Sequence, residues 1–239
     1  MAERTTVGAH RSRYESCPDV CGHLDNPGVA LDALDSIDFS RRETTKDQAR
    51  IEADLERMDL AGKIILHVGV GNSKLAERFA PRVKLIDGLT IAPPEKARAD
   101  SLGLPNYRVR LGNKYSRSLR LEHRYDFIID NNLAGFVCCK YHFYLMWNTY
   151  LDALRPDGKI LTHQRGMDWT FADPRWRLGY DDLVALEAKL PVRVSRLGEK
   201  VYAIAKAGTG SDPRRRARSR PRVEITRPAR RGDASRRSP

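Results

Sequence analysis

Lys63-Ile-Ile-Leu-His-Val-Gly-Val-Gly-Asn-Ser73 is the stretch that decides the fold. Its first half is mostly apolar, which is typical of a buried strand, and two glycines one residue apart then interrupt it. Because glycine has no Cβ, the backbone at Gly69 and Gly71 can turn sharply and lie against a ligand. The pattern predicts a strand over 63–68, a tight turn, and a helix over 73–80.

A second apolar run over 83–87 ends in Asp87, eighteen residues after Gly69. A glycine turn, a helix, a strand and an acid at the strand tip form the arrangement by which a doubly wound sheet holds a ribose. The ligand is therefore expected to be a nucleoside-bearing cofactor. The dinucleotide fingerprint needs a third glycine where this chain has Lys74, which argues against NAD.

Strands and helices alternate through the rest of the chain and end in a hairpin. Phe127, Ile128 and Ile129 are continuously apolar, as a strand covered on both faces should be. Further strands are expected at 107–111, 126–130 and 159–163, the last after a turn at 156–158, with helices at 45–60, 93–102, 136–153 and 181–189 and hairpin strands at 192–196 and 201–205. These elements predict an α/β fold: a doubly wound, mostly parallel seven-stranded sheet with a C-terminal antiparallel hairpin.

The charge of the chain is concentrated at its C-terminal end. Eleven Arg and three acids give 208–239 a net charge of +8, which leaves +4 of the total +12 for all other residues. We expect an irregular N-terminal extension over 1–43, a cofactor-binding domain over 44–207, and a disordered Arg-rich tail over 208–239, because the tail has too few apolar residues to offset ordering entropy.

Neither a membrane span nor a secretory signal is expected. No apolar run approaches the roughly 18 residues that a membrane-spanning helix needs. The first residues, MAERTTVGAHRSRYES, contain no hydrophobic segment, so a cytoplasmic location is expected. Cys17, Cys21 and His23 have loose spacing for a zinc site, and the adjacent Cys138 and Cys139 complement them poorly, so no metal is expected.

The chain resembles the class I S-adenosylmethionine-dependent methyltransferases. The resemblance covers roughly residues 60 to 207 and is carried by HVGVGNS (67–73), LIDG (85–88), YDFIIDNN (125–132) and LRPDGKILTH (154–163). It implies S-adenosyl-L-methionine as the cofactor and a Rossmann-like methyltransferase fold. The family usually has an acid where this chain has His67 and a glycine where it has Ser73, and Ser73 is expected to cap the following helix.

The resemblance also places the binding residues. It puts the glycine loop at Gly69 and Gly71, the ribose-binding acid at Asp87, and the methyl-donor end of the fourth strand at Asp130 and Asn131. Asn72 lies in the same loop, and Asn113 at the tip of the third strand is expected near the adenine. Asp87→Ala is expected to weaken cofactor binding sharply, because it removes a charge-assisted hydrogen-bond acceptor.

Three residues are candidates for catalysis, since an oxygen nucleophile needs a base to remove its proton. His163 ends the fifth strand and is the best base by position, and a structural histidine is the alternative. Asp130 could act as a base or cap a helix. His142 lies in a helix rich in aromatic residues, where a core role is the alternative. Trp169, Arg175 and Trp176 follow the fifth strand, where the family often builds its acceptor pocket.

Three functions remain open from the sequence. The first is O-methylation of a small-molecule or glycan acceptor, and HVGVGNS loosely resembles small bacterial sugar methyltransferases such as nodulation-factor fucose O-methyltransferases. The second is an RNA methyltransferase or nucleic-acid-binding protein whose Arg-rich tail contacts phosphates or acidic surfaces non-specifically. The third is a catalytically degenerate fold that serves as a scaffold.

Overall fold

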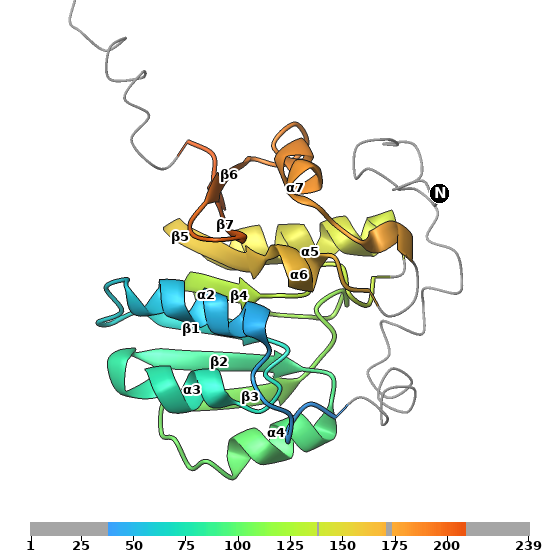
Figure 1. Ribbon diagram of the computed structural model, residues 1–239. Helices are drawn as coiled ribbons and strands as arrows, with labels where there is room; N and C mark the ends of the chain where they lie inside the picture. Colours follow the sequence, from blue (N-terminus) through green and yellow to red (C-terminus); the bar gives the residue numbers. More distant parts are fainter. Residues whose placement is uncertain (1–37, 138, 171–173, 209–239) are drawn as a thin grey trace, which may run out of the picture. The chain divides into compact units, whose positions relative to one another are not determined.

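The strands form one sheet in which parallel strands are followed by an antiparallel pair at one edge (Figure 1). The computed structural model describes residues 38–137, 139–170 and 174–208. The strands are β1 (Ile64–Val68), β2 (Leu85–Thr90), β3 (Tyr107–Leu111), β4 (Tyr125–Asp130), β5 (Leu154–His163), β6 (Val192–Arg196) and β7 (Val201–Lys206). Their order is β3-β2-β1-β4-β5-β7-β6, which confirms the predicted seven-stranded fold.

The pairing of the strands explains why ligands can meet at one edge. β3, β2, β1, β4 and β5 run parallel to one another, whereas β7 runs antiparallel to both β5 and β6. The sheet reverses its strand order at β1, from which one half of the chain winds to β2 and the other to β4. Loops that follow β1 and β4 therefore diverge and leave a crevice at the carboxyl ends of the strands.

Helices cover both faces of the sheet. Their bounds are α2 (Lys46–Glu56), α3 (Lys74–Phe79), α4 (Pro93–Asp100), α5 (Lys140–Ala153), α6 (Gln164–Met167) and α7 (Tyr180–Leu186), with short 3-10 turns η3 (Ala80–Arg82) and η4 (Pro174–Trp176). Apolar side chains of α2, α3 and α4 form one buried core with the sheet, and those of α5 and α7 form another. In β1, Ile65 faces the first core and Leu66 the second, as alternation along a strand requires.

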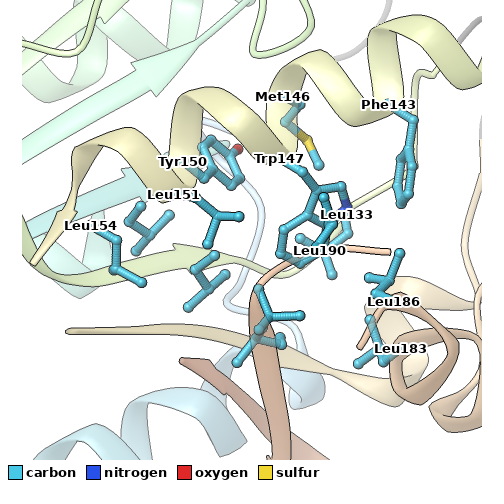
Figure 2. Close-up of a cluster of buried hydrophobic side chains, with 14 of the residues drawn as sticks. Leu133, Phe143, Met146, Trp147, Tyr150, Leu151, Leu154, Leu183, Leu186 and Leu190 are labelled. Carbon is cyan, nitrogen blue, oxygen red and sulfur yellow. The ribbon is translucent and has the colours of Figure 1, made fainter. Parts of the chain in front are cut away.

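The core beneath α5 is rich in aromatic residues. Figure 2 shows Phe143 and Trp147 of α5 pointing toward the leucines of α7 and the segment after it, with Tyr150 farther along the helix beside Leu151. Trp147 and Tyr150 are fully buried. These aromatic residues of α5 therefore belong to the core. This favours the core role that the sequence allowed as the alternative to catalysis for His142.

Several predicted boundaries need correction. β2 continues to Thr90 rather than ending at Asp87, and α5 begins at Lys140 rather than near 136. The expected turn at 156–158 lies within β5, where the pairing with β4 shifts register between Tyr125 and Phe127. The first helix ends at Glu56, and Gly62 lies beyond its end.

Some predictions fall outside the described residues. These are most of the extension over 1–43, all but the first residue of the tail over 208–239, and Cys17, Cys21, His23 and Cys138. Among the helices that the structure describes, none has the length and apolar character that a bilayer crossing requires.

Candidate cofactor and acceptor site

A cavity of about 710 Å³ lies at the carboxyl ends of the parallel strands. Its volume falls within the range of about 300–1,000 Å³ that is usual for small-molecule sites. The walls come from the turn after β1, the ends of β2, β3 and β4, the start of α2, and α6 after β5. This is the crevice that the sheet topology predicts, and residues of α2 close part of it.

The glycine turn after β1 forms the floor of one end of the cavity. Gly69 and Gly71 have φ of 73° and 50°, values in the left-handed region that side chains disfavour. The Gly69 amide donates to the carbonyl of Leu89 at 2.8 Å, which ties the turn to β2. Ser73 also has a left-handed φ of 61°, and its hydroxyl pairs with that of Tyr107 rather than capping α3, contrary to prediction.

Asp87 does not line this cavity, which corrects its assignment as the ribose-binding acid. It is the third residue of β2, and its side chain lies on the face of the sheet covered by α5. Its carboxylate accepts a hydrogen bond from the Tyr125 hydroxyl at 2.8 Å, and His123 Nδ1 lies 2.8 Å from the same oxygen. Asp87 thus ties β2 to the beginning of β4.

Glu95 is the acid that reaches the glycine turn from the β2 side. It lies in the first turn of α4, is 5% exposed and lines the cavity. Its Oε2 accepts from the Gly71 amide at 3.1 Å and from the Thr90 hydroxyl at 2.5 Å. Burial raises the pKa of Glu95, and these hydrogen bonds oppose the shift. The signal in the sequence was an acid in the first turn of a helix that follows a strand.

His67 lies on β1 immediately before the turn and lines the cavity. It is 3% exposed, and its Nδ1 is buried without a hydrogen-bond partner among the described residues. Burial lowers the pKa of His67 to about 4, so the ring is neutral at physiological pH. A neutral imidazole can accept a hydrogen bond from a ligand, although it supplies no negative charge.

Asp130 lines the cavity, but its carboxylate is fully engaged. Lys114 Nζ contacts both oxygens at 2.9 and 2.8 Å, and the Tyr150 hydroxyl donates at 2.8 Å. The ion pair is buried, with side-chain exposures of 8% for Lys114 and 1% for Asp130. Burial lowers the pKa of Lys114, and Asp130 opposes that shift. The Lys114–Asp130 ion pair therefore forms part of the cavity wall, and the Asp130 carboxylate is not free to act as a base.

Asn131 and Asn113, proposed from the sequence as cofactor-binding residues, both line the cavity. The Asn131 side-chain amide donates to Asp47 at the start of α2, and its own Oδ1 is buried without a partner in the described chain. Asn113 Oδ1 accepts from the Tyr115 amide at 3.0 Å, which fixes the loop after β3. Sequence reasoning missed Asp47, whose contact with Asn131 joins residues far apart in the chain.

The structure leaves the two catalytic histidine candidates outside the cavity lining. His163 is 7% exposed, and its Nδ1 accepts from the Arg165 amide at 3.0 Å, so it caps α6. Burial lowers the pKa of His163. His142 is 1% exposed, and its Nδ1 lies 3.4 Å from Cys139 Sγ. Both positions correspond to the structural alternatives.

Asn72 connects the glycine turn to the segment that precedes α2. Its amide nitrogen donates to the Arg42 carbonyl at 2.8 Å and to the Thr44 hydroxyl at 3.2 Å, while its Oδ1 accepts from the Lys74 amide at 3.0 Å. The segment 39–45, which we call the strap, contributes Phe39, Arg42, Glu43, Thr44 and Thr45 to the cavity wall. Asn72 itself lines the cavity, and its hydrogen bonds hold the strap against the glycine turn.

No cluster of three or more potential metal-ligating side chains occurs within the part of the chain that the structure describes.

Comparisons with known proteins identify the fold. No family model matches the sequence, and no curated protein matches it. The N-methyltransferase NodS from Bradyrhizobium japonicum WM9, in complex with S-adenosyl-L-homocysteine, is similar over 74% of this chain and 96% of its own, with 12% identity and a TM-score of 0.54. A DhpI complex with S-adenosylhomocysteine (SAH) is similar over 77% of this chain and 95% of its own, with 15% identity and a TM-score of 0.51.

A TehB-like SAM-dependent methyltransferase from Corynebacterium glutamicum ATCC 13032 Kitasato is similar over 77% of this chain and 98% of its own, with 16% identity and a TM-score of 0.50. The chain thus has the class I methyltransferase fold, the fold predicted from the resemblance. At these identities the likeness carries the fold alone, so activity must be argued from the cavity.

Proposed function

We propose that this protein is an S-adenosylmethionine-dependent methyltransferase that methylates an oxygen atom of a small-molecule or glycan acceptor. The observation that carries the proposal is the pairing of a left-handed glycine turn with a buried acid, Glu95, at the crevice of the sheet. A turn of this kind admits close approach of a ligand, and a buried carboxylate accepts hydrogen bonds from ribose hydroxyls.

The residues that line the cavity fit the cofactor. Glu95 and the glycine turn would hold the ribose side, and Asn113 at the end of β3 would meet the adenine. The unpartnered Nδ1 of His67 is a buried acceptor for a donor group of the ligand. When bound, S-adenosylmethionine supplies a methyl group already activated on a sulfonium, so alignment and deprotonation of the acceptor are what the protein must provide.

Asp47 replaces the histidines as the proposed proton acceptor. It lines the cavity, is 8% exposed, and is oriented by the side-chain amide of Asn131 at the end of β4. One carboxylate oxygen receives that hydrogen bond, which leaves the other to take the proton of an acceptor hydroxyl. Asp130 cannot do this because Lys114 and Tyr150 occupy its oxygens.

Calorimetric titration with SAH tests cofactor binding directly. We expect saturable binding in the micromolar range, and transfer of radiolabelled methyl from S-adenosylmethionine into small-molecule or glycan fractions rather than RNA or protein fractions. Absence of SAH binding at about millimolar concentration would refute the proposal, because about −4 kcal/mol is the weakest affinity that a working site of this kind should show.

Asp47→Asn tests the proposed base. The substitution keeps the shape of the side chain and a partner for Asn131, so SAH affinity should stay within about two-fold, whereas kcat should fall at least about 100-fold, as for loss of a general base. His163→Gln serves as the control, since His163 does not line the cavity, and it should leave kcat within about three-fold. A large loss in the control with none in Asp47→Asn would reverse the assignment.

A further inference from the structure

We propose that the end of the cavity formed by α6 and the residues after it binds an aromatic carboxylate as the methyl acceptor. Trp169 would contact its flat ring and Arg165 its carboxylate. The inference rests on the proposed function, since it assigns the acceptor end of the same cavity. Both residues come from the segment at α6, which follows β5, and both line the cavity.

Trp169 presents an exposed flat surface at this end. Trp169 is 37% exposed and belongs to the large hydrophobic residues that the described chain leaves at its surface. Its six-membered ring lies against Gly135, where an added Cβ would come within 2.8 Å of Cζ3. Phe136 meets it edge-on, with ring centroids 5.4 Å apart and planes at 71°. Gly135 and Phe136 thus fix the indole, and its exposed surface offers a stacking platform for a planar ligand.

Cations without an ion-pair partner at the cavity indicate which charge the planar ligand should carry. The buried acids of the wall are engaged: Asp130 with Lys114, Glu95 with Thr90 and Gly71, Glu52 with Gln48 and Arg78, and Asp47 with Asn131. By contrast, among the described residues the side chains of Arg165 and Lys46 take part in no hydrogen bond or ion pair, and Arg42 only lies over the Phe39 ring.

Among the cations that line the cavity, Lys114 is paired with Asp130, whereas Arg165, Lys46 and Arg42 form no ion pair with the described residues. Arg165 is the cation on the same segment as Trp169, four residues before it. A guanidinium pairs with a carboxylate through two parallel hydrogen bonds, which fixes both position and orientation. A ring stacked on Trp169 with its carboxylate toward Arg165 would leave its opposite edge free to face the cavity interior and Asp47.

Binding of two matched probes to the SAH-saturated full-length protein tests the inference. The probes are 4-hydroxybenzoate and 4-hydroxybenzamide, which share shape and differ in charge, and methyl α-glucoside serves as a neutral sugar. By calorimetry we expect the benzoate to bind at least about ten-fold more tightly than the amide, in keeping with one charge-assisted contact. Binding of the benzoate should weaken as salt increases.

Variants assign the preference to the two residues. In Arg165→Ala, the affinities for 4-hydroxybenzoate and 4-hydroxybenzamide should differ by no more than about two-fold. In Trp169→Ala, the affinity for both aromatic probes should fall by about ten-fold, because one stacking contact is lost. Arg124→Ala is the matched control, because Arg124 is an exposed arginine at the opposite end of β4, and it should change neither affinity. SAH affinity of every variant should stay within about two-fold of the parent value, which reports that the cavity is intact.

The outcomes separate the inference from the proposed function. Equal affinity for the two aromatic probes, tighter binding of the glucoside, or an unchanged ratio in Arg165→Ala would overturn the inference while SAH binding upholds the cofactor site. Failure of the parent protein to bind SAH would instead overturn the proposed function, and the acceptor assignment with it.

Discussion

At the scale of single residues, the position of an acid on its strand matters more than its distance from the glycine turn in sequence. Asp87 follows Gly69 at the spacing expected of a ribose-binding acid, yet β2 runs on to Thr90 and the Asp87 carboxylate points to Tyr125 and His123. Glu95 meets the turn instead, through the amide of Gly71. A linear motif cannot show which face of a strand its acid occupies.

Paired substitutions distinguish these two acids. Glu95→Gln should weaken SAH binding by at least about ten-fold, because a neutral amide replaces a charged acceptor. Asp87→Asn should leave SAH affinity within about two-fold and should lower the free energy of unfolding by about 1–2 kcal/mol, since it weakens the hydrogen bonds to Tyr125 and His123. Calorimetry and urea unfolding measure the two effects. Loss of SAH affinity in Asp87→Asn alone would restore the original assignment.

His67 should produce a pH dependence of stability. Its pKa is about 4 in the folded protein and near 6.5 when exposed, so between these values the unfolded chain binds more protons. The free energy of unfolding should therefore fall as pH decreases from 6.5 to 4, by up to about 2–3 kcal/mol from this residue. Urea unfolding across that range should show a steeper fall in the parent protein than in His67→Asn.

The comparison between parent and variant isolates His67 from other groups. Burial raises the pKa of Glu52 and Glu95, which makes their contributions increase stability as pH falls toward their unfolded values. Those contributions are present in both proteins and cancel in the difference. Parallel pH profiles for the two proteins would show that His67 is not neutral and buried in solution.

At the scale of elements, the second strand shows why boundaries were harder to predict than order. The predicted strand ends at Asp87, just before Gly88, but the structure places Gly88 within β2. Glycine is needed there because an added Cβ would come within 2.6 Å of Val109 and 2.8 Å of Val70. Likewise Gly158 lies in β5, where a Cβ would meet the Tyr125 carbonyl at 2.8 Å. A glycine that permits close packing has the same letter as one that ends a strand.

The strap offers a prediction at this scale. Asn72→Asp keeps the oxygen that accepts from the Lys74 amide but loses the donor to the Arg42 carbonyl, against which it places a carboxylate. If the strap helps to enclose the cofactor, SAH should dissociate about five-fold faster, a loss on the order of 1 kcal/mol, while its association rate changes little. Stopped-flow or surface-plasmon measurements report both rates.

Asn106→Ala is the control for the strap. The side-chain amide of Asn106 also donates two hydrogen bonds, to the carbonyls of Ala80 and Val83, but Asn106 lies outside the cavity lining. This variant should lose stability by about 1–2 kcal/mol without a change in the dissociation rate of SAH. An unchanged rate in Asn72→Asp would show that the strap does not retain the cofactor.

At the scale of the whole molecule, the order of strands and the terminal hairpin could be predicted because they depend on repeated patterns. Alternating strands and helices require a parallel sheet, and the short link between 192–196 and 201–205 requires antiparallel pairing, which β6 and β7 confirm. The cavity wall could not be predicted to the same depth. Contacts such as Asp47 with Asn131 or Lys114 with Asp130 join separate elements, and only the folded chain brings them together.

The concentration of charge in 208–239 leads to a last prediction. Residues 208–239 contribute +8 of the total +12, whereas the cavity residues that the structure describes lie within 39–169. Removal of 209–239 should therefore leave SAH affinity and methyl transfer to a small acceptor within about two-fold of the parent values. Non-specific binding to single-stranded RNA, and its steep dependence on salt, should be lost, since that dependence scales with the number of phosphates neutralised. Loss of small-acceptor activity in the truncated protein, with RNA restoring it in the parent, would favour the RNA methyltransferase alternative.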